Sequence, residues 1–481
     1  MKKHFLSTSL ALAYFAFNSL ILQAESRPPS EIERDKIIEM SQQVLNLSDM
    51  KVKEREDIFR IQVLGLDWDV GGKVFEPEDS SNIPTDPNGN KIGMFLIHGG
   101  SGDHRSKDKE ARFLVSKFGY KVVTMSYPGR LYLLDPSRDW PGDTLKLDGM
   151  GTDLENILSV RTPIWNKDKL ITRNQYEIIE DKSLKNKYGT LTLACAKEGT
   201  EFHKRMSGWP MAFEAAGKDL MNRHLPLGEY SIYIHGHSTG GPFSLMLTQR
   251  VKNIVGVTGM ENSAFGYIFR VQTRSSGNPT GKQYGDLPFN CLHVRTWRDT
   301  ARYAGPEALM QEGPEALMQL PTLIEKVFAS WKRRTAQPNF KAEGPIHFGS
   351  THQLSQMARA TAKRLDFSTE KTQELIEHYV SLSRELRGLG VKPVPPIIFG
   401  MSQSSADHTP EKYREVTLPM FAAMDPPPKV SLVEFKAGVH GYTRPEEDLP
   451  MGTFPAVAKV WHDAIMKGYY ADYASQWATK E

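Results

Sequence analysis

The stretch that decides the fold is YSIYIHGHSTGGPFSLML, residues 230–247, near the middle of the chain. An apolar, β-branched run ends in Gly-His-Ser-Thr-Gly, and a second apolar run follows. This pattern predicts a strand, a very tight turn and a helix. In such a turn Ser238 takes a strained backbone conformation, so Gly236 and Gly240 must be small. The turn lifts the Ser238 hydroxyl clear of the sheet edge. It also puts the N–H of Thr239 at a helix N-terminus, where a developing oxyanion is stabilised.

The segments around this turn predict alternating strands and helices. Residues 58–66 and 72–78 are expected to form two strands around an intervening turn. Strand followed by helix and strand implies right-handed crossovers and a parallel sheet. The fold class is therefore α/β, a mostly parallel central sheet flanked by helices. The other predicted strands are 91–100, 120–129, 230–236, 253–262, 396–402 and 429–438, and the predicted helices between them include 108–119, 241–251 and 454–470.

The domain organisation follows from where this alternation fails. The chain has 481 residues, of which 39% are hydrophobic and 24% charged, as expected of a globular protein. Residues 130–190 show no regular alternation, and amphipathic helical stretches predict a large helical lid or cap insertion at 263–393. The predicted parts are a signal peptide at 1–24, a peripheral N-terminal segment at 25–54, a core formed by 55–262 and 394–481, and the insertion at 263–393.

The N-terminus is typical of a secretory signal peptide, since two lysines precede an apolar stretch that ends in the small residue Ala24. An uncleaved anchor is the alternative, because the stretch is nearly long enough to span a thin bilayer. Without Lys2 and Lys3, 58 basic residues face 57 acidic ones. This balance gives no reason to expect nucleic acid as a partner. We expect a secreted or periplasmic protein with no membrane span after signal removal, and the oligomeric state stays open.

Cysteine usage limits the chemistry further. Cys195 and Cys291 are the two cysteines of the sequence. In an oxidising compartment they could pair and close a long loop, and the alternative is that both are unpaired and buried. Two cysteines without clustered histidines exclude a zinc-finger type of site, and we expect no metal.

Candidate partners for Ser238 follow other predicted strands. A serine hydroxyl needs a base to take its proton, an acid to orient that base, and donors for the oxyanion. The candidate base, His440, follows the last strand, and the candidate acid, Asp407, follows the strand before it. Glu261, which follows the strand after the serine helix, is a further carboxylate at such a position. All of these positions lie beyond the C-terminal ends of strands, where open parallel sheets build their ligand sites.

The chain order Ser238, Asp407, His440 with a strand–serine–helix elbow resembles the α/β-hydrolase superfamily. The resemblance covers the sheet-forming parts of 55–262 and 394–470, and it implies an α/β-hydrolase fold. The N-terminal segment and the insertion lie outside it. Some members of the superfamily place the acid after the strand that follows the nucleophile helix, and Glu261 occupies that position here, so the resemblance implies Glu261 as the alternative acid.

The same resemblance implies the oxyanion donors. In the superfamily a His-Gly-rich turn after an early strand supplies one donor, and here that turn is LIHGGSGDHR, residues 96–105. Carried over to this chain, the donors are backbone N–H groups near Gly99, Gly100 or Ser101, together with that of Thr239.

These residues predict a carboxylic ester hydrolase, esterase- or lipase-like, that works through an acyl-enzyme. A small-molecule or lipid-like ester is the expected substrate, and no cofactor is expected. The same machinery serves amide, peptide and thioester bonds, so an amidase, a peptidase or a thioesterase is the alternative. A catalytically silent hydrolase-fold binding protein is the alternative from another class.

Overall fold

The computed structural model describes the following parts of the chain: residues 30–63, 65–99, 102–132, 144–146, 159–161, 164–186, 189–197, 199–238, 240–248, 250–261, 291–293, 368–374, 394–403 and 428–468, and the single positions 410, 413, 414, 418, 421 and 470.

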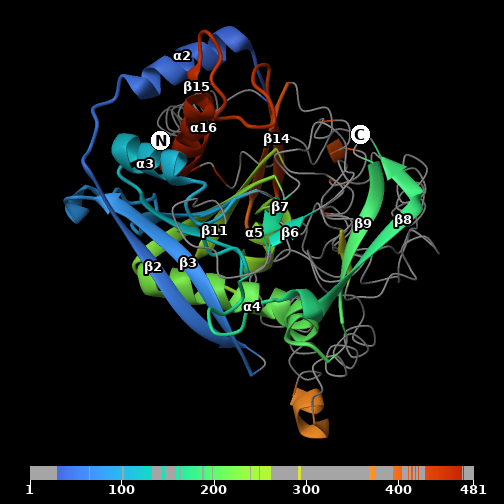
Figure 1. Cartoon of the computed structure of the whole chain (residues 1–481). Coiled ribbons are helices and arrows are strands. Elements are labelled where there is room, and N and C mark those ends of the chain that lie inside the picture. The colour runs from blue at the N-terminus through green and yellow to red at the C-terminus, as the bar shows by residue number, and fades with distance from the viewer. Residues whose placement is uncertain are drawn as a thin grey trace, which may run out of the picture.

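Nine strands of the described residues form a sheet at the centre (Figure 1). Neighbouring strands are parallel except at one end, where β3 runs antiparallel to both β5 and β2. In spatial order the strands are β1 (Glu31–Ile32), β14 (Val430–Phe435), β13 (Ile397–Ser402), β11 (Ile254–Met260), β10 (Tyr230–His237), β4 (Lys91–Ile97), β5 (Lys121–Met125), β3 (Leu66–Pro77) and β2 (Val52–Val63).

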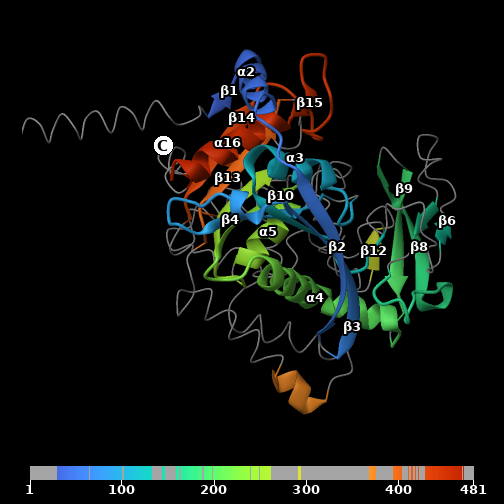
Figure 2. The ribbon, with the colours of Figure 1, turned by 90° about the vertical axis from the view of Figure 1, so that its left-hand side faces the viewer.

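Helices cover both faces of this sheet (Figure 2). One face carries α3 (Asp108–Phe118) and α16 (Phe454–Met466), and α2 (Arg34–Leu45) packs on α16. The other face carries α4 (Glu201–His224) and α5 (Gly240–Thr248). The predicted fold class, a mostly parallel central sheet flanked by helices, is confirmed.

The central strands are apolar almost throughout because helices bury both of their faces. A large buried cluster lies between the sheet and helices α2, α3 and α16, and includes Leu96, Leu114 and Trp461. The N-terminal segment contributes to it as well, through Ile32, Ile37, Met40 and Val44.

The predicted turn between residues 66 and 72 is wrong. β3 runs unbroken through Gly71 and Gly72, and the chain reverses at Gly65, whose φ is +72°. A Cβ on Gly71 would lie 2.6 Å from the His104 ring, and one on Gly72 would lie 2.9 Å from Leu220. These glycines therefore permit close packing within a strand rather than a turn.

A second, antiparallel sheet begins in residues 130–190, where we expected no regular structure, and takes its third strand from the predicted helical insertion. It consists of β8 (Tyr176–Asn186), β9 (Gly189–Ala196) and β12 (Cys291–His293), and β6 (Thr144–Lys146) pairs separately with β7 (Ser159–Arg161). Of the predicted insertion, the structure describes only β12 and residues 368–374. The predicted signal peptide lies outside the described residues.

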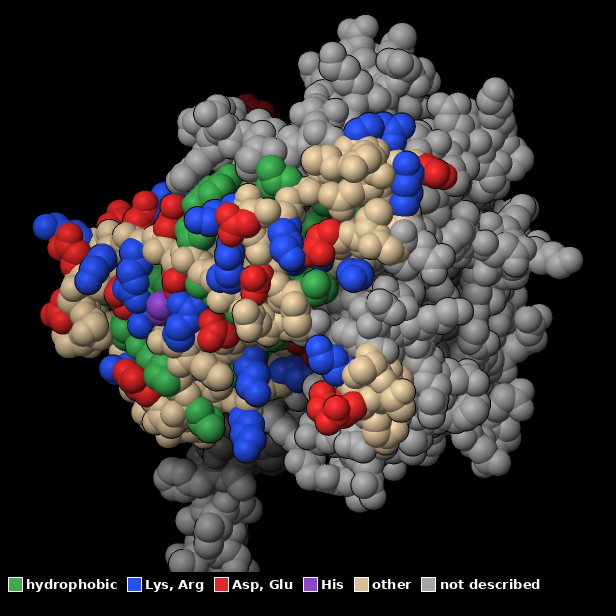
Figure 3. Space-filling view, turned by 60° about the horizontal axis from the view of Figure 1, so that its bottom comes forward, with side chains coloured by type: hydrophobic (Ala, Val, Ile, Leu, Met, Phe, Trp, Pro, Cys, Tyr) green, Lys and Arg blue, Asp and Glu red, His purple; other side chains and the backbone are tan. Residues whose placement is uncertain are grey.

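Among the described residues, no helix combines the length and the apolar character needed to cross a membrane. Nor does that part of the chain gather three His, Cys, Asp or Glu residues in a group that could hold a metal ion. On the face in Figure 3, basic and acidic side chains of the described residues are interspersed. Ion pairs between neighbouring elements of the described residues include Arg112 with Glu54 and Arg55 with Glu76.

The register of the second sheet leads to a prediction for the cysteines. β12 places the backbone of Cys291 directly opposite that of Cys195 on β9. Opposed residues of antiparallel strands have Cα atoms about 4.5 to 5.5 Å apart, a separation that a disulfide spans. In protein from an oxidising compartment we expect no thiol to react with iodoacetamide until the denatured chain is reduced, and two to react afterwards. Alkylation of both cysteines without reductant would contradict this.

The contact between α16 and α3 leads to a prediction for stability against pH. The ring of His462 stacks on Phe118 at 4.3 Å, and Nδ1 lies 2.7 Å from the Tyr120 hydroxyl. Burial lowers the pKa of His462 to about 4. In the unfolded chain the His462 imidazole takes up a proton at an ordinary pKa of about 6.5. In the folded protein it does so only near the lowered pKa, so stability is lost as the pH falls between these two values.

We therefore expect His462→Gln to make stability less sensitive to acid. Between about pH 7 and 4.5, the free energy of unfolding of the wild type should fall by about 2 kcal/mol more than that of the variant. Urea unfolding at a series of pH values measures this difference. Parallel curves for the two proteins would show that this imidazole does not titrate as proposed.

Candidate active site

Ser238 lies in the tight turn between β10 and α5 that the sequence predicts. Its φ is +52°, the left-handed region that a non-glycine residue adopts at a cost of about 1 kcal/mol. Its N–H donates to the carbonyl of Met260 at 2.9 Å, and its own carbonyl accepts the N–H of Gly241 at 3.2 Å. The strained turn is therefore held by a neighbouring strand and by the first turn of the helix.

The flanking glycines are explained by close backbone contacts. A Cβ on Gly236 would lie 2.3 Å from the carbonyl oxygen of Gly240, within the turn itself. A Cβ on Gly240 would lie 2.8 Å from the carbonyl oxygens of Ile97 and His98, at the end of β4. Backbone atoms cannot move aside as a flexible side chain can, so the spacing Gly-x-Ser-x-Gly is a steric requirement.

The turn that follows β4 lies directly against Ser238. A Cβ on Gly99 would lie 3.2 Å from the Cβ of Ser238. The turn is fixed by His98, whose Nδ1–H donates to the carbonyl of Gly99 at 2.6 Å, and by the Tyr127 hydroxyl, which donates to the carbonyl of His98 at 2.7 Å. Of the predicted oxyanion donors, Gly99 is thus next to the serine, while Gly100, Ser101 and Thr239 lie outside the described residues.

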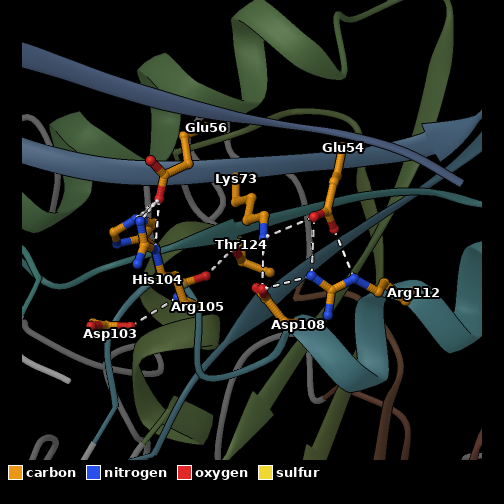
Figure 4. A network of polar contacts seen from close by, with 9 residues as sticks. All are labelled: Glu54, Glu56, Lys73, Asp103, His104, Arg105, Asp108, Arg112 and Thr124. Atoms are coloured by element: carbon orange, nitrogen blue, oxygen red, sulfur yellow. Dashed lines mark hydrogen bonds and ion pairs between the residues drawn. The ribbon is translucent and has the colours of Figure 1, made fainter. Parts of the chain in front are cut away.

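Beyond this turn the chain is clamped to the β2–β3 hairpin by a polar network (Figure 4). His104 is buried, and its Nε2 lies 3.2 Å from Glu56, whose carboxylate also accepts from Nε of Arg105 at 2.7 Å. The Thr124 hydroxyl on β5 donates to the carbonyl of His104 at 2.5 Å. Burial raises the pKa of Glu56, but Arg105 and His104 outweigh it and hold that pKa below its usual value. The segment after the turn is therefore fixed to two strands at once.

The second half of the network holds the start of α3. Lys73 on β3 donates to Asp108 at 2.6 Å, and Arg112 joins Asp108 at 3.2 Å and Glu54 at 2.8 Å (Figure 4). Burial raises the pKa of Asp108, and the charges of Lys73 and Arg112 oppose this. Together the two halves give the turn beside Ser238 a rigid support, which an oxyanion site requires.

His440 lies on the loop after β14, close to the end of β10. Its side chain is 42% exposed. Its carbonyl accepts a hydrogen bond from Nε2 of His237 at 3.1 Å, and the two imidazole rings lie 5.3 Å apart. Burial, and after it the charge of Lys107, lowers the pKa of His237 well below its usual value, so this ring is neutral. The loop of the predicted base is thus attached to the residue that precedes Ser238.

Glu261 is the acid that the structure places near His440. It follows β11, is fully buried, and its Oε2 lies 3.9 Å from Nδ1 of His440. Its Oε1 accepts the N–H of Ser402 at 2.5 Å, and its own N–H donates to the carbonyl of Gly400. Its φ of +55° is a second strained position in the same site. Asp407 lies outside the described residues, so its role stays a prediction.

Sequence reasoning missed several residues that support these groups. His98 and Tyr127 hold the turn beside Ser238, and Lys107 bonds to Tyr442 on the His440 loop. Tyr442 carried a possible signal, since it lies only two positions after His440 in the sequence. His98 carried one as well, since it belongs to the His-Gly turn and bonds to the next residue, Gly99. Tyr127 and Lys107 carried none, because their bonds to His98 and Tyr442 join segments far apart in the chain.

Comparisons with known proteins complete the description. No protein-family model matches the sequence, and no curated protein matches it. Among solved structures, the chain is similar to a ferulic acid esterase, with 9% identity, a TM-score of 0.32, and coverage of 89% of this chain and 100% of that one. It is also similar to a thioesterase domain from the curacin biosynthetic pathway, with 13% identity, a TM-score of 0.32, and coverage of 85% and 99%.

A third similar structure is a peroxisomal alpha-beta-hydrolase from Saccharomyces cerevisiae, with 10% identity, a TM-score of 0.34, and coverage of 87% of this chain and 90% of that one. At identities and TM-scores this low, the chemistry of those proteins does not transfer to this chain. The strand order and the serine turn described above carry the assignment of the fold.

Proposed function

We propose that this chain, which has the fold of the α/β-hydrolase superfamily, is a serine hydrolase that cleaves carboxylic esters. One observation carries the proposal. The strained Ser238, the buried carboxylate of Glu261 and the loop of His440 follow the C-terminal ends of β10, β11 and β14, and His440 contacts both His237 and Glu261. Such an edge is where open parallel sheets place their reacting groups.

Glu261 is our proposed acid, with Asp407 as the alternative. A buried carboxylate that faces Nδ1 fixes the tautomer of an imidazole and stabilises its protonated form. The present 3.9 Å between Glu261 and His440 is longer than a hydrogen bond. Catalytic contacts of this kind are often long without substrate and tighten when it binds.

The proposed reaction proceeds through an acyl-enzyme. The Ser238 oxygen attacks the ester carbonyl while Nε2 of His440 takes the hydroxyl proton. The imidazolium then gives that proton to the departing alcohol, and the acyl group stays on Ser238. Water, deprotonated by the same ring, attacks the acyl-enzyme and releases the acid, and the proton returns to Ser238. Backbone N–H groups near Gly99 and at Thr239 stabilise the oxyanion in both steps.

We further propose that the protein is exported, on the strength of its N-terminal sequence, and that its substrate is a small-molecule or lipid-like ester. The insertion at 263–393 would then form a lid that excludes water and selects the acyl or alcohol group.

The test is a set of p-nitrophenyl esters of graded chain length beside peptide p-nitroanilides and thioesters, together with labelling by a fluorophosphonate probe. We expect ester turnover and stoichiometric labelling at Ser238, with a chain-length optimum that measures the depth of the pocket. Preference for anilides or thioesters would reassign the bond type. A correctly folded protein that neither turns over nor becomes labelled would establish the catalytically silent alternative.

The matched control is Ser238→Ala beside Ser244→Ala. Ser244 lies on α5, the helix that follows Ser238, is fully buried, and donates to the carbonyl of Gly241 at 2.6 Å. Only the first variant should lose labelling and turnover. Loss in both would point to the fold of the helix instead of the Ser238 hydroxyl.

A further inference from the structure

A buried lysine that bonds to Tyr442, two positions after His440, needs an explanation. The side chain of Lys107 is only 6% exposed, and its ammonium donates to Glu110 at 2.7 Å and to the Tyr442 hydroxyl at 3.0 Å. Burying such a charge is costly unless every donor finds a partner. Burial lowers the pKa of Lys107, but Glu110 and Tyr442 together outweigh it and raise that pKa above its usual value. The lysine is therefore a permanent cation inside the protein.

The hydrogen bonds continue from Tyr442 to the strand that carries the serine. Tyr442 is 1% exposed, and its hydroxyl lies 3.1 Å from Nε2 of His235. An ammonium has donors only, so the hydroxyl accepts from Lys107 and its own proton is left for His235. Burial, and after it the charge of Lys107, lowers the pKa of His235 well below its usual value, so this imidazole is neutral and able to accept.

This chain of contacts joins the three segments that carry the proposed chemistry. Lys107 is the residue before α3, at the end of the segment that follows the turn at Gly99. His235 lies on β10 three positions before Ser238, and Tyr442 lies two positions after His440. The hydrogen bond from His237 to the carbonyl of His440 provides a second attachment between the same strand and the same loop.

We propose that Lys107 and Tyr442 are positioning residues, which hold the loop of His440 at a fixed distance from the strand that ends in Ser238. This inference rests on the proposed function. Stability alone does not require the buried ion pair of Lys107 and Glu110, because apolar residues of similar volume often replace such a pair without loss of stability. The proposed task of holding the loop gives a reason for its presence. Neither residue touches the reacting atoms, and both act through the backbone on which His440 sits.

The test compares Tyr442→Phe with Tyr120→Phe. Both substitutions keep the ring and remove a buried hydroxyl that bonds to a histidine, at 3.1 Å from His235 and at 2.7 Å from His462. We expect both variants to lose thermal stability, and Tyr442→Phe to lose more, because it also removes an acceptor from the buried ammonium of Lys107. Only Tyr442→Phe should slow phosphonylation of Ser238, by about tenfold or more, since small displacements of a catalytic base cost that much. Phosphonylation requires no knowledge of the natural substrate.

A double variant, Lys107→Met with Glu110→Leu, removes the buried pair without leaving either charge alone. It should slow phosphonylation as Tyr442→Phe does, and the triple variant should be no slower than the double one, because all three changes break one chain of contacts. Additive effects would overturn the inference.

Hydrogen exchange of the peptide at 436–444, measured by mass spectrometry, supplies a readout that needs no activity. Exchange should be faster in Tyr442→Phe and unchanged in Tyr120→Phe. If wild-type protein is not labelled, the proposed function fails, and faster exchange would still establish that Tyr442 holds the loop. If wild-type protein is labelled and Tyr442→Phe matches it in labelling rate and in exchange, the positioning role is refuted while the proposed function stands.

Discussion

Glu261→Gln should lower the turnover of an activated ester by about 10⁴-fold, the loss expected when the acid of such a triad becomes an amide. The glutamine can keep the hydrogen bond that Glu261 accepts from Ser402, so the fold should be retained. Its amide group would, however, face Nδ1 of His440 without a negative charge. The imidazolium formed during acylation would then lack its stabilising partner. The rate of p-nitrophenol release under saturating ester, corrected for the folded fraction, measures the effect.

Two further variants complete this prediction. Asp407→Asn should keep near-wild-type turnover if Glu261 is the acid. Glu214→Gln removes another buried carboxylate, which pairs with Arg250 at 2.8 Å, and should reduce stability without reducing turnover. The reverse result, an inactive Asp407→Asn beside an active Glu261→Gln, would transfer the role to Asp407.

Gly236→Ala should destabilise the fold by about 3 kcal/mol, at the upper end for overpacking, and abolish fluorophosphonate labelling. The added methyl group would lie 2.3 Å from the carbonyl oxygen of Gly240. Relief requires β10 and α5 to separate, and that movement removes the turn that presents Ser238. Urea unfolding gives the change in stability, and labelling of the folded fraction gives the change in reactivity.

Gly441→Ala is the matched control for stability. No atom lies within 4 Å of the position that its Cβ would take, and its φ is not in the left-handed region. Its free energy of unfolding should stay within about 0.5 kcal/mol of the wild type. If Gly236→Ala proved as stable and as reactive as wild-type protein, the steric account of the turn would be wrong.

The parts of the fold that sequence reasoning predicted well are those whose cause is local. An apolar run that ends at a Gly-x-Ser-x-Gly pentapeptide carries its whole signal within 18 residues, and the structure has β10, the turn and α5 there. The same holds for β4 and β5 with α3 between them, since buried parallel strands are continuous apolar runs.

The errors came where a residue serves a distant neighbour. Gly71 and Gly72 have the composition of a turn, yet they lie inside β3 because His104 and Leu220, far along the chain, pack against them. The hairpin of β8 and β9 lies in a stretch where no alternation was evident to us. Its third strand, β12, comes from the segment that we expected to be a helical insertion.

The sequence by itself determined that an α/β sheet would present a strained serine, because backbone sterics at Gly236, Ser238 and Gly240 act over a few residues. That the Glu261 carboxylate lies 3.9 Å from Nδ1 of His440, and that Lys107 bonds to Tyr442 two positions beyond it, only the tertiary structure decided. Glu261, Lys107 and Tyr442 reach the site from three separate elements. Their proximity depends on the order of the strands in the sheet and on the packing of the loops. The spacing of residues along the chain predicts neither the strand order nor the loop packing.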